Sequence, residues 1–158
     1  MTRALLTITL ALATAACNQT SGTGSATRPV QTINQQQVTT MKIRITIDGT
    51  AVTATLAENA TSRDFLSLLP LTLTLKDYAA TEKISDLPRR LSTDGAPASM
   101  DPHTGDITYY APWGNLAIFY SDGHLSDGLV KLGTIDGGFE ALRRSTPFEA
   151  TIEREVPR

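Results

Sequence analysis

The sequence predicts a mainly β domain, in which at least seven short strands form a closed barrel or sandwich with one or two short helices. Several runs from residue 41 onward alternate apolar and polar side chains, the pattern of a strand with one buried face. Clusters of Gly, Pro, Asp and Ser separate these runs at short intervals, as turns do. Residues 41–158 are also enough to bury about two-thirds of their unfolded surface, so the domain needs no covalent staple.

A β-hairpin is expected at the start of this domain. Residues 41–47 and 52–56 both alternate with a period of two, and Asp48-Gly49 lies between them. A type I′ turn requires positive φ at both of its central residues, and Asp-Gly satisfies that requirement. The two runs are therefore predicted to pair with each other.

A short helix is predicted over residues 59–69, where the apolar period changes. Residues 61–64 read Thr-Ser-Arg-Asp, which has the spacing of a capping box with Asp in place of the usual Glu. Apolar side chains then gather on one helical side, and Pro70 ends the segment. Alternation resumes at once, so residues 71–75 are predicted to begin another strand.

The remaining elements are short and are separated by loops. In order they are a short strand within residues 82–91, a surface loop at 92–105, strands at 106–111 and 115–120, a loop at 121–128, a strand at 129–135, one or two helical turns at 138–144, and a final strand around 148–152.

The first sixteen residues have the composition of a secretory signal peptide. Arg3 supplies a positive charge, and residues 4–16 are small or apolar without a charge. This run is too short for a membrane-spanning helix, which needs about 20 residues. We expect residues 1–16 to be a signal peptide that is removed.

Cys17, the single cysteine of the chain, directly follows Ala15-Ala16. This arrangement resembles the lipobox of bacterial lipoproteins, in which the cysteine is lipidated and becomes the new N-terminus, although Thr14 stands where that motif prefers Leu. The alternative is an ordinary signal peptide with a cysteine there by accident. Residues 17–40 are rich in Thr, Ser, Gln, Gly and Asn and are expected to form a flexible tether between the lipid and the domain.

Composition excludes several classes of function. The chain carries 14 basic and 16 acidic side chains, for a net charge of −2, so no excess of positive charge suggests a nucleic-acid partner. One cysteine allows neither an internal disulfide framework nor a cysteine-rich zinc site, and two histidines leave little scope for histidine chemistry. Phosphate-binding, dinucleotide-binding and HExxH motifs do not occur, so we expect no cofactor and no metal.

One segment resembles a known family. Residues 105–120 read GDITYYAPWGNLAIFY, and together with MKIR at 41–44, LLP at 68–70 and KLG at 131–133 they resemble the small cyclophilin-like fold proteins of bacteria. The resemblance covers nearly all of the domain that begins at residue 41. It implies a closed β-barrel of about eight strands with short capping helices.

The resemblance to true cyclophilins is one of fold, and function does not follow from fold. True prolyl isomerases carry a Phe-His-Arg segment, whose arginine polarises the prolyl amide, and a Gln-Gly-Gly-Asp segment. Neither occurs in this sequence, and the nearest substitutes, Arg89 and Arg90, follow a proline in a different context. No catalytic residue is therefore carried over.

A loop at residues 101–106 contains Asp101, His103 and Asp106 within six positions, which poses the question of a metal site. The structural alternative is favoured, because Asp-Pro and Thr-Gly are turn formers and Asp106 would bond loop amides at the barrel rim. Residues 121–128 pose the same question, but they lack the order of a calcium loop and are read as plain surface.

The aromatic cluster is the best candidate for a binding site. Five of the nine aromatic side chains lie within residues 109–120, and neighbours in a strand face opposite sides of the sheet. The structural alternative is that all of them are packing. The functional interpretation is that Tyr110, Trp113 and Tyr120 frame an apolar groove for a peptide or small ligand, with Arg89 and Arg90 clamping a carboxylate or carbonyl.

These observations predict a lipid-anchored cyclophilin-like domain on the membrane of the bacterial cell envelope, outside the cytoplasm. It is expected to bind a peptide segment or small ligand without catalysis. Two alternatives stay open: a peptidyl-prolyl isomerase with a rearranged site, and a structural envelope protein.

Overall fold

The structure is a computed structural model that describes residues 41–155. The predicted signal peptide, Cys17 and the predicted tether lie outside these residues. Within the described part, no helix has the length and apolar character needed to cross a membrane.

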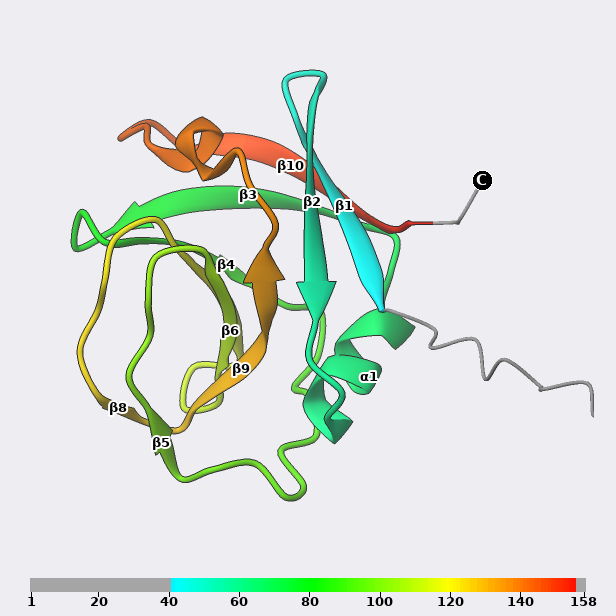
Figure 1. Ribbon diagram of the computed structural model, residues 1–158, viewed down its shortest axis with the longest axis vertical. Coiled ribbons are helices and arrows are strands. Elements are labelled where there is room, and N and C mark those ends of the chain that lie inside the picture. Colours follow the sequence, from blue (N-terminus) through cyan, green and yellow to red (C-terminus); the bar gives the residue numbers. More distant parts are fainter. Residues whose placement is uncertain (1–40, 156–158) are drawn as a thin grey trace, which may run out of the picture. The chain divides into compact units, whose positions relative to one another are not determined.

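Eight antiparallel strands close into a barrel, in the order β1-β10-β3-β4-β7-β6-β9-β2 (Figure 1). This confirms the predicted mainly β class and the closed barrel of about eight strands. The strands of the barrel are β1 Lys42–Ile47, β2 Thr50–Leu56, β3 Leu71–Tyr78, β4 Glu82–Asp86, β6 Asp106–Tyr110, β7 Asn115–Phe119, β9 Leu129–Ile135 and β10 Phe148–Arg154.

The β1–β2 hairpin has the predicted turn. Asp48 and Gly49 both have positive φ, of 47° and 79°, and Ile45 of β1 lies opposite Val52 of β2. Burial in β1 alternates strictly, with Ile43, Ile45 and Ile47 at most 1% exposed. The hairpin therefore presents one apolar face to the barrel interior.

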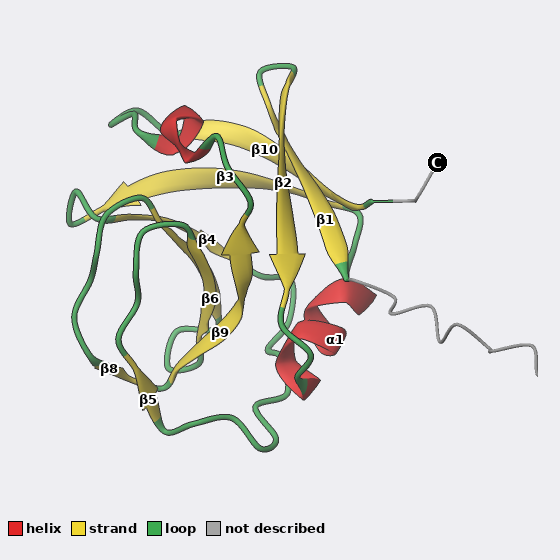
Figure 2. Cartoon of the chain, in the orientation of Figure 1, coloured by secondary structure: helices red, strands yellow, loops and turns green. Residues whose placement is uncertain are grey.

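The helix α1, Ala60–Ser67, begins one residue before the predicted capping box, which starts at Thr61. Its N-cap is Asn59, whose side chain accepts a hydrogen bond from the Ser62 amide at 2.7 Å. Asn is a stronger N-cap than Thr, which explains the earlier start. The helix follows the end of β2 (Figure 2) and contacts β9, and its Phe65 and Leu66 side chains join the core of the barrel.

The predicted loops at 92–105 and 121–128 each contain a two-residue strand. β5, Ser99–Met100, pairs with β8, Ser126–Asp127, in a small second sheet. A ladder this short leaves no periodic signal, so the sequence alone predicts a loop at both positions. The predicted helical turns at 138–144 are present as a 3₁₀ turn, Phe139–Leu142.

The strands β6 and β7 are buried on both faces, unlike β1. All five residues of β7 are buried, as are four of the five in β6. One face belongs to the barrel core, and the other holds a second apolar cluster of Ala117, Phe119 and Leu129, against which Met100 of β5 packs. The small β5–β8 sheet thus gives this side of the barrel an outer layer.

Candidate functional site

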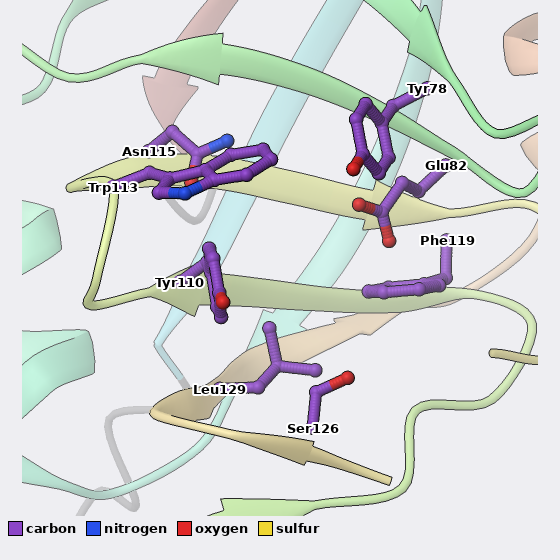
Figure 3. A pocket seen from close by; sticks show the side chains of 8 residues that line it. All are labelled: Tyr78, Glu82, Tyr110, Trp113, Asn115, Phe119, Ser126 and Leu129. Atoms are coloured by element: carbon purple, nitrogen blue, oxygen red, sulfur yellow. The ribbon is translucent and has the colours of Figure 1, made fainter. Parts of the chain in front are cut away.

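A pocket of about 180 Å³ opens on the outside of the barrel, beside this outer layer (Figure 3). Its lining comes from six strands and one turn, and each strand contributes the residue at or near one of its ends. The lining residues are Tyr78 of β3, Glu82 of β4, Tyr110 of β6, Trp113 of the turn after β6, Asn115 and Phe119 of β7, Ser126 of β8 and Leu129 of β9.

Strand pairing explains why these side chains meet. Glu82 lies opposite Phe119, while Tyr110 lies opposite both Asn115 and Leu129 on its two neighbours. Directly opposite residues project to the same face of a sheet. Because side chains alternate along a strand, Tyr109 projects the other way and is buried in the core at 1% exposure.

Trp113 stands between two tyrosines. Its ring centroid lies 5.5 Å from that of Tyr78 and 5.2 Å from that of Tyr110, and the ring planes cross at 85° and 81°. These are edge-to-face contacts, which aromatic quadrupoles favour. With 54% of its surface exposed, Trp113 lies at the mouth of the pocket rather than in the core.

The turn that carries Trp113 is held by Arg90. The Arg90 guanidinium donates to the carbonyl oxygens of Ala111, at 2.5 Å, and Pro112, at 3.2 Å. The Gly114 amide closes the same turn on the Tyr110 carbonyl at 2.8 Å. Arg90 therefore positions the turn, and its guanidinium is engaged with backbone instead of lining the pocket.

Asn115 is a polar residue in the lining of the pocket. It is 2% exposed, and its Oδ1 is the single buried side-chain polar atom without a hydrogen-bond partner in residues 41–155. A buried acceptor without a partner costs about 1–3 kcal/mol. Asn115 also lines the pocket, so a ligand bound there would lie beside a polar side chain whose oxygen the protein leaves unpaired.

Glu82 supplies a carboxyl group that points into the same space between Tyr78 and Phe119 (Figure 3). Burial raises the pKa of Glu82 to about 7, because no cation or donor within the described residues offsets its desolvation. The carboxyl group therefore changes its charge near neutral pH.

The adjacent residue, Lys83, projects to the opposite side of the sheet. It is fully buried and donates to Asp77 Oδ1 at 2.5 Å and to the Arg144 carbonyl oxygen. Tyr120 also donates to Asp77, at 2.6 Å, and its ring lies 4.9 Å from the Lys83 ammonium. Lys83 holds the pKa of Asp77 below its usual range, chiefly through their hydrogen bond.

Of the five predicted ligand-binding residues, the structure brings Tyr110 and Trp113 together in the pocket. Tyr120 lies apart, in the group with Lys83 and Asp77; burial and the hydrogen bond to Asp77 raise its pKa to about 12. Arg89 also lies apart, because both of its terminal nitrogens donate to Asp64, at 2.9 and 2.6 Å. This pairing, with the Ser92 amide, lowers the pKa of Asp64 to about 2.

Sequence reasoning missed Glu82 and Asn115, the two polar groups of the pocket. Asn115 had a detectable signal, since it is an amide at the start of a strand that is otherwise apolar. It shares its face of β7 with Phe119 by the period of two. Glu82 gave no such signal, because its burial depends on the long-range pairing of β4 with β7.

The acidic loops are built as turns. Asp106 accepts a hydrogen bond from the His103 amide at 3.1 Å and pairs with Lys131 at 2.7 Å, the rim role expected for it. Asp122 accepts from both the amide and the hydroxyl of Thr104. No group of three or more His, Cys, Asp or Glu side chains suited to a metal occurs within residues 41–155.

The fold and the pocket define a small closed β-barrel with a site on its outer wall. A model of the cyclophilin-like family matches residues 45–153, which is most of the chain. The chain therefore belongs to the cyclophilin-like family, as its aromatic segment indicated.

Two solved structures share the fold. The hypothetical protein AF2241 from Archaeoglobus fulgidus superimposes with a TM-score of 0.58 at 18% identity, covering 73% of this chain and 95% of the other. McbB, solved in complex with tryptophan, superimposes with a TM-score of 0.54 at 16% identity, covering 73% of this chain and 45% of the other. No curated protein matches this chain in sequence.

Proposed function

We propose that this chain is a ligand-binding domain without catalytic activity, held at a membrane of the bacterial cell envelope by a lipid on Cys17. The binding site is the pocket between Trp113, Glu82 and Asn115. Its volume of about 180 Å³ lies below the roughly 300–1,000 Å³ of pockets for drug-sized ligands. The occupant is therefore a small molecule or a single side chain of a peptide.

The unpartnered Oδ1 of Asn115 is the observation that carries this proposal. Packing explains an aromatic cluster equally well, but packing gives no reason to bury an amide oxygen without a donor. A ligand with an N–H or O–H group would satisfy that oxygen, while the rings of Tyr110 and Trp113 cover the apolar part of the ligand.

The positions of the arginines favour binding over prolyl isomerisation. An isomerase needs a donor aimed at the prolyl amide inside an apolar groove, since rotation about that bond faces a barrier of about 18–20 kcal/mol. Arg89 is paired with Asp64, and Arg90 is bonded to two backbone carbonyls. Neither guanidinium lines the pocket.

Binding can be tested with a library of small molecules and short peptides, read by the emission of Trp113, the single tryptophan of the chain. We expect a subset to shift the emission, and Asn115→Leu to weaken their binding by about tenfold or more. Tyr120→Phe, outside the pocket, is the control and should bind as the wild type does.

The proposal is wrong if no compound shifts the emission, or if Asn115→Leu binds every hit unchanged. Catalysis of Xaa-Pro exchange that disappears in Arg89→Ala or Arg90→Ala would establish the isomerase alternative instead.

The membrane anchor is tested separately, with Cys17→Ser. Stable membrane attachment needs more than one acyl chain, because each buried CH₂ contributes about 0.8 kcal/mol. The substitution removes the thiol that would carry the lipid. We expect the variant to move from the membrane fraction to the soluble fraction of cells. Equal membrane retention of both proteins would contradict the anchor.

A further inference from the structure

We propose that the pocket selects a small organic cation, a protonated alkylamine that still carries an N–H, because the Glu82 carboxyl group, three aromatic rings and the free Asn115 oxygen surround one small space. This inference rests on the proposed function and names the ligand class of the same site. It follows from three properties of the pocket: its rings, its charge and its unused acceptor.

The rings form walls suited to a cation. Tyr78 and Tyr110 each meet Trp113 at nearly a right angle, so the three rings face the space from different directions. The face of an aromatic ring carries negative potential and attracts ammonium groups, most strongly in Trp. Such walls also contact the alkyl groups of an amine, which a bare metal ion lacks.

When Glu82 is ionised, the charge of the pocket is negative and uncompensated. Glu82 is half-buried and has no cationic partner in residues 41–155, while its neighbour Lys83 projects into the barrel and pairs with Asp77. Two adjacent residues thus place opposite charges on opposite sides of one strand. A cation bound beside Glu82 would replace the partner that the protein itself does not provide.

The acceptor requires a donor. Asn115 Oδ1 has no hydrogen-bond partner within residues 41–155, and a ligand N–H or O–H group that reaches it from the pocket would satisfy it. A protonated amine combines this donor with the positive charge that Glu82 lacks. A quaternary ammonium ion has the charge without the donor, so the two kinds of cation separate the two contributions.

Binding should depend on pH through Glu82. Its ionised form attracts a cation and its protonated form does not, so affinity rises as pH rises through about 7. The other titratable groups in the lining are Tyr78 from β3 and Tyr110 from β6; β7, β8 and β9 contribute Asn115, Phe119, Ser126 and Leu129, which do not titrate.

The test uses three ligands of nearly equal shape with the purified full-length protein, measured by calorimetry and by Trp113 emission. They are protonated 2-methoxy-N,N-dimethylethylamine, which has an N–H; its quaternary N-methyl derivative, which has no N–H or O–H; and the neutral ether 1-methoxy-3,3-dimethylbutane. We expect each step in this series to lower affinity by about tenfold. The quaternary ion keeps its charge at every pH, so its affinity should rise about fivefold from about pH 6 to about pH 8.

Two variants assign these effects to residues. Glu82→Gln keeps the shape and should lower the affinity for both cations by about tenfold and abolish the pH dependence; Glu149→Gln, at an exposed position, is the matched control. Asn115→Leu should remove the preference for the amine over the quaternary ion. Thermal unfolding monitored by circular dichroism establishes that each variant is folded.

The inference is overturned if the neutral ether binds as tightly as the cations, or if Glu82→Gln binds them unchanged. It is also overturned if none of the three binds while a library compound binds in an Asn115-dependent manner, which leaves the proposed function standing. Absence of binding by all three and by the library contradicts both.

Discussion

The inside and the outside of the barrel wall bury polar groups in opposite ways. Inside, Lys83 is fully buried, but Asp77 and the Arg144 carbonyl oxygen accept its protons. Outside, Asn115 keeps an oxygen without a donor, and Glu82 keeps a carboxyl group without a cation. The inner groups are paired within the protein and stabilise the fold, whereas the outer groups are left unpaired, as expected of groups that bind a ligand. The comparison supports the pocket as the candidate site without reference to any relative.

The largest expected effect is on the inner side, with Asp77→Ala. It removes the carboxylate that neutralises Lys83 and leaves a buried ammonium without its counter-charge. Breaking a buried pair in this way costs about 3–5 kcal/mol of unfolding free energy, measured by chemical denaturation. Lys42→Ala, which removes the exposed pair with Asp136, should cost less than about 1 kcal/mol. Equal losses of unfolding free energy in both variants would contradict the claim that the buried pair stabilises the fold more than the surface pair.

The next effect concerns the outer layer, with Gly128→Ala compared with Gly49→Ala. Both glycines have nearly the same positive φ, 74° and 79°, so the backbone strain is matched. An added Cβ meets Pro112 at 2.8 Å in the first case and nothing within 4 Å in the second. We expect Gly128→Ala to lose about 1–3 kcal/mol more and to shift Trp113 emission, since Pro112 belongs to the same turn. Identical losses would mean that Pro112 moves away from the added Cβ atom at no measurable cost in stability.

Asn115→Leu should have the opposite sign. Without ligand it removes a buried amide oxygen that has no donor, so we expect a gain of about 1–3 kcal/mol in unfolding free energy. Thermal and chemical denaturation of the ligand-free protein measure it, with Asn59→Leu as the contrasting variant. Asn59 caps α1 and bonds the Lys131 carbonyl, so its loss destabilises. A loss of stability in Asn115→Leu would contradict this expectation, because it would mean that the Asn115 side chain stabilises the fold as Lys83 and Asp77 do.

The smallest effect is at the surface, with Arg89→Met. Arg89 holds the pKa of Asp64 at about 2, below its ordinary value. Because the folded-state pKa is depressed, this stabilisation is fully present above about pH 4 and is lost as pH falls through about 2. The variant should lose at most about 1 kcal/mol near neutral pH, and its stability should fall less between about pH 4 and pH 2. Denaturation curves across that range test this; parallel curves would contradict it.

Local patterns predicted the parts of the fold that local chemistry determines. Asp48-Gly49 identified the hairpin turn, and alternation identified β1 and β2, because turn geometry and strand period depend on adjacent residues. The pairing of β5 with β8 depends on two loops that meet only in three dimensions. The start of α1 at Asn59 shows that one stronger cap displaces a plausible later one.

Two aromatic residues of the candidate site were predictable from the sequence, and its two polar residues were not. Tyr110 and Trp113 stood out as aromatic residues in a short segment, and both line the pocket. Tyr120 belongs to the same segment, yet it lies with Asp77 in another part of the molecule. Glu82 approaches the rings through the pairing of β4 with β7, and no sequence period contains that register. The sequence therefore predicted aromatic residues of the pocket wall, but it did not predict the polar side chains of Glu82 and Asn115.

The order of Glu82 and Lys83 in β4 has a consequence for folding. A slip of one residue in the pairing of a strand turns each of its side chains to the other face. In β4 such a slip would bring the ammonium among the rings of Tyr78 and Trp113 and drive the carboxylate into the apolar interior beside Asp77. That misaligned barrel would hold two like charges in its core. The order of Glu82 and Lys83 therefore disfavours the misaligned register of β4. The residue that gives the pocket its charge, Glu82, thus also helps to set the strand pairing that forms the pocket wall.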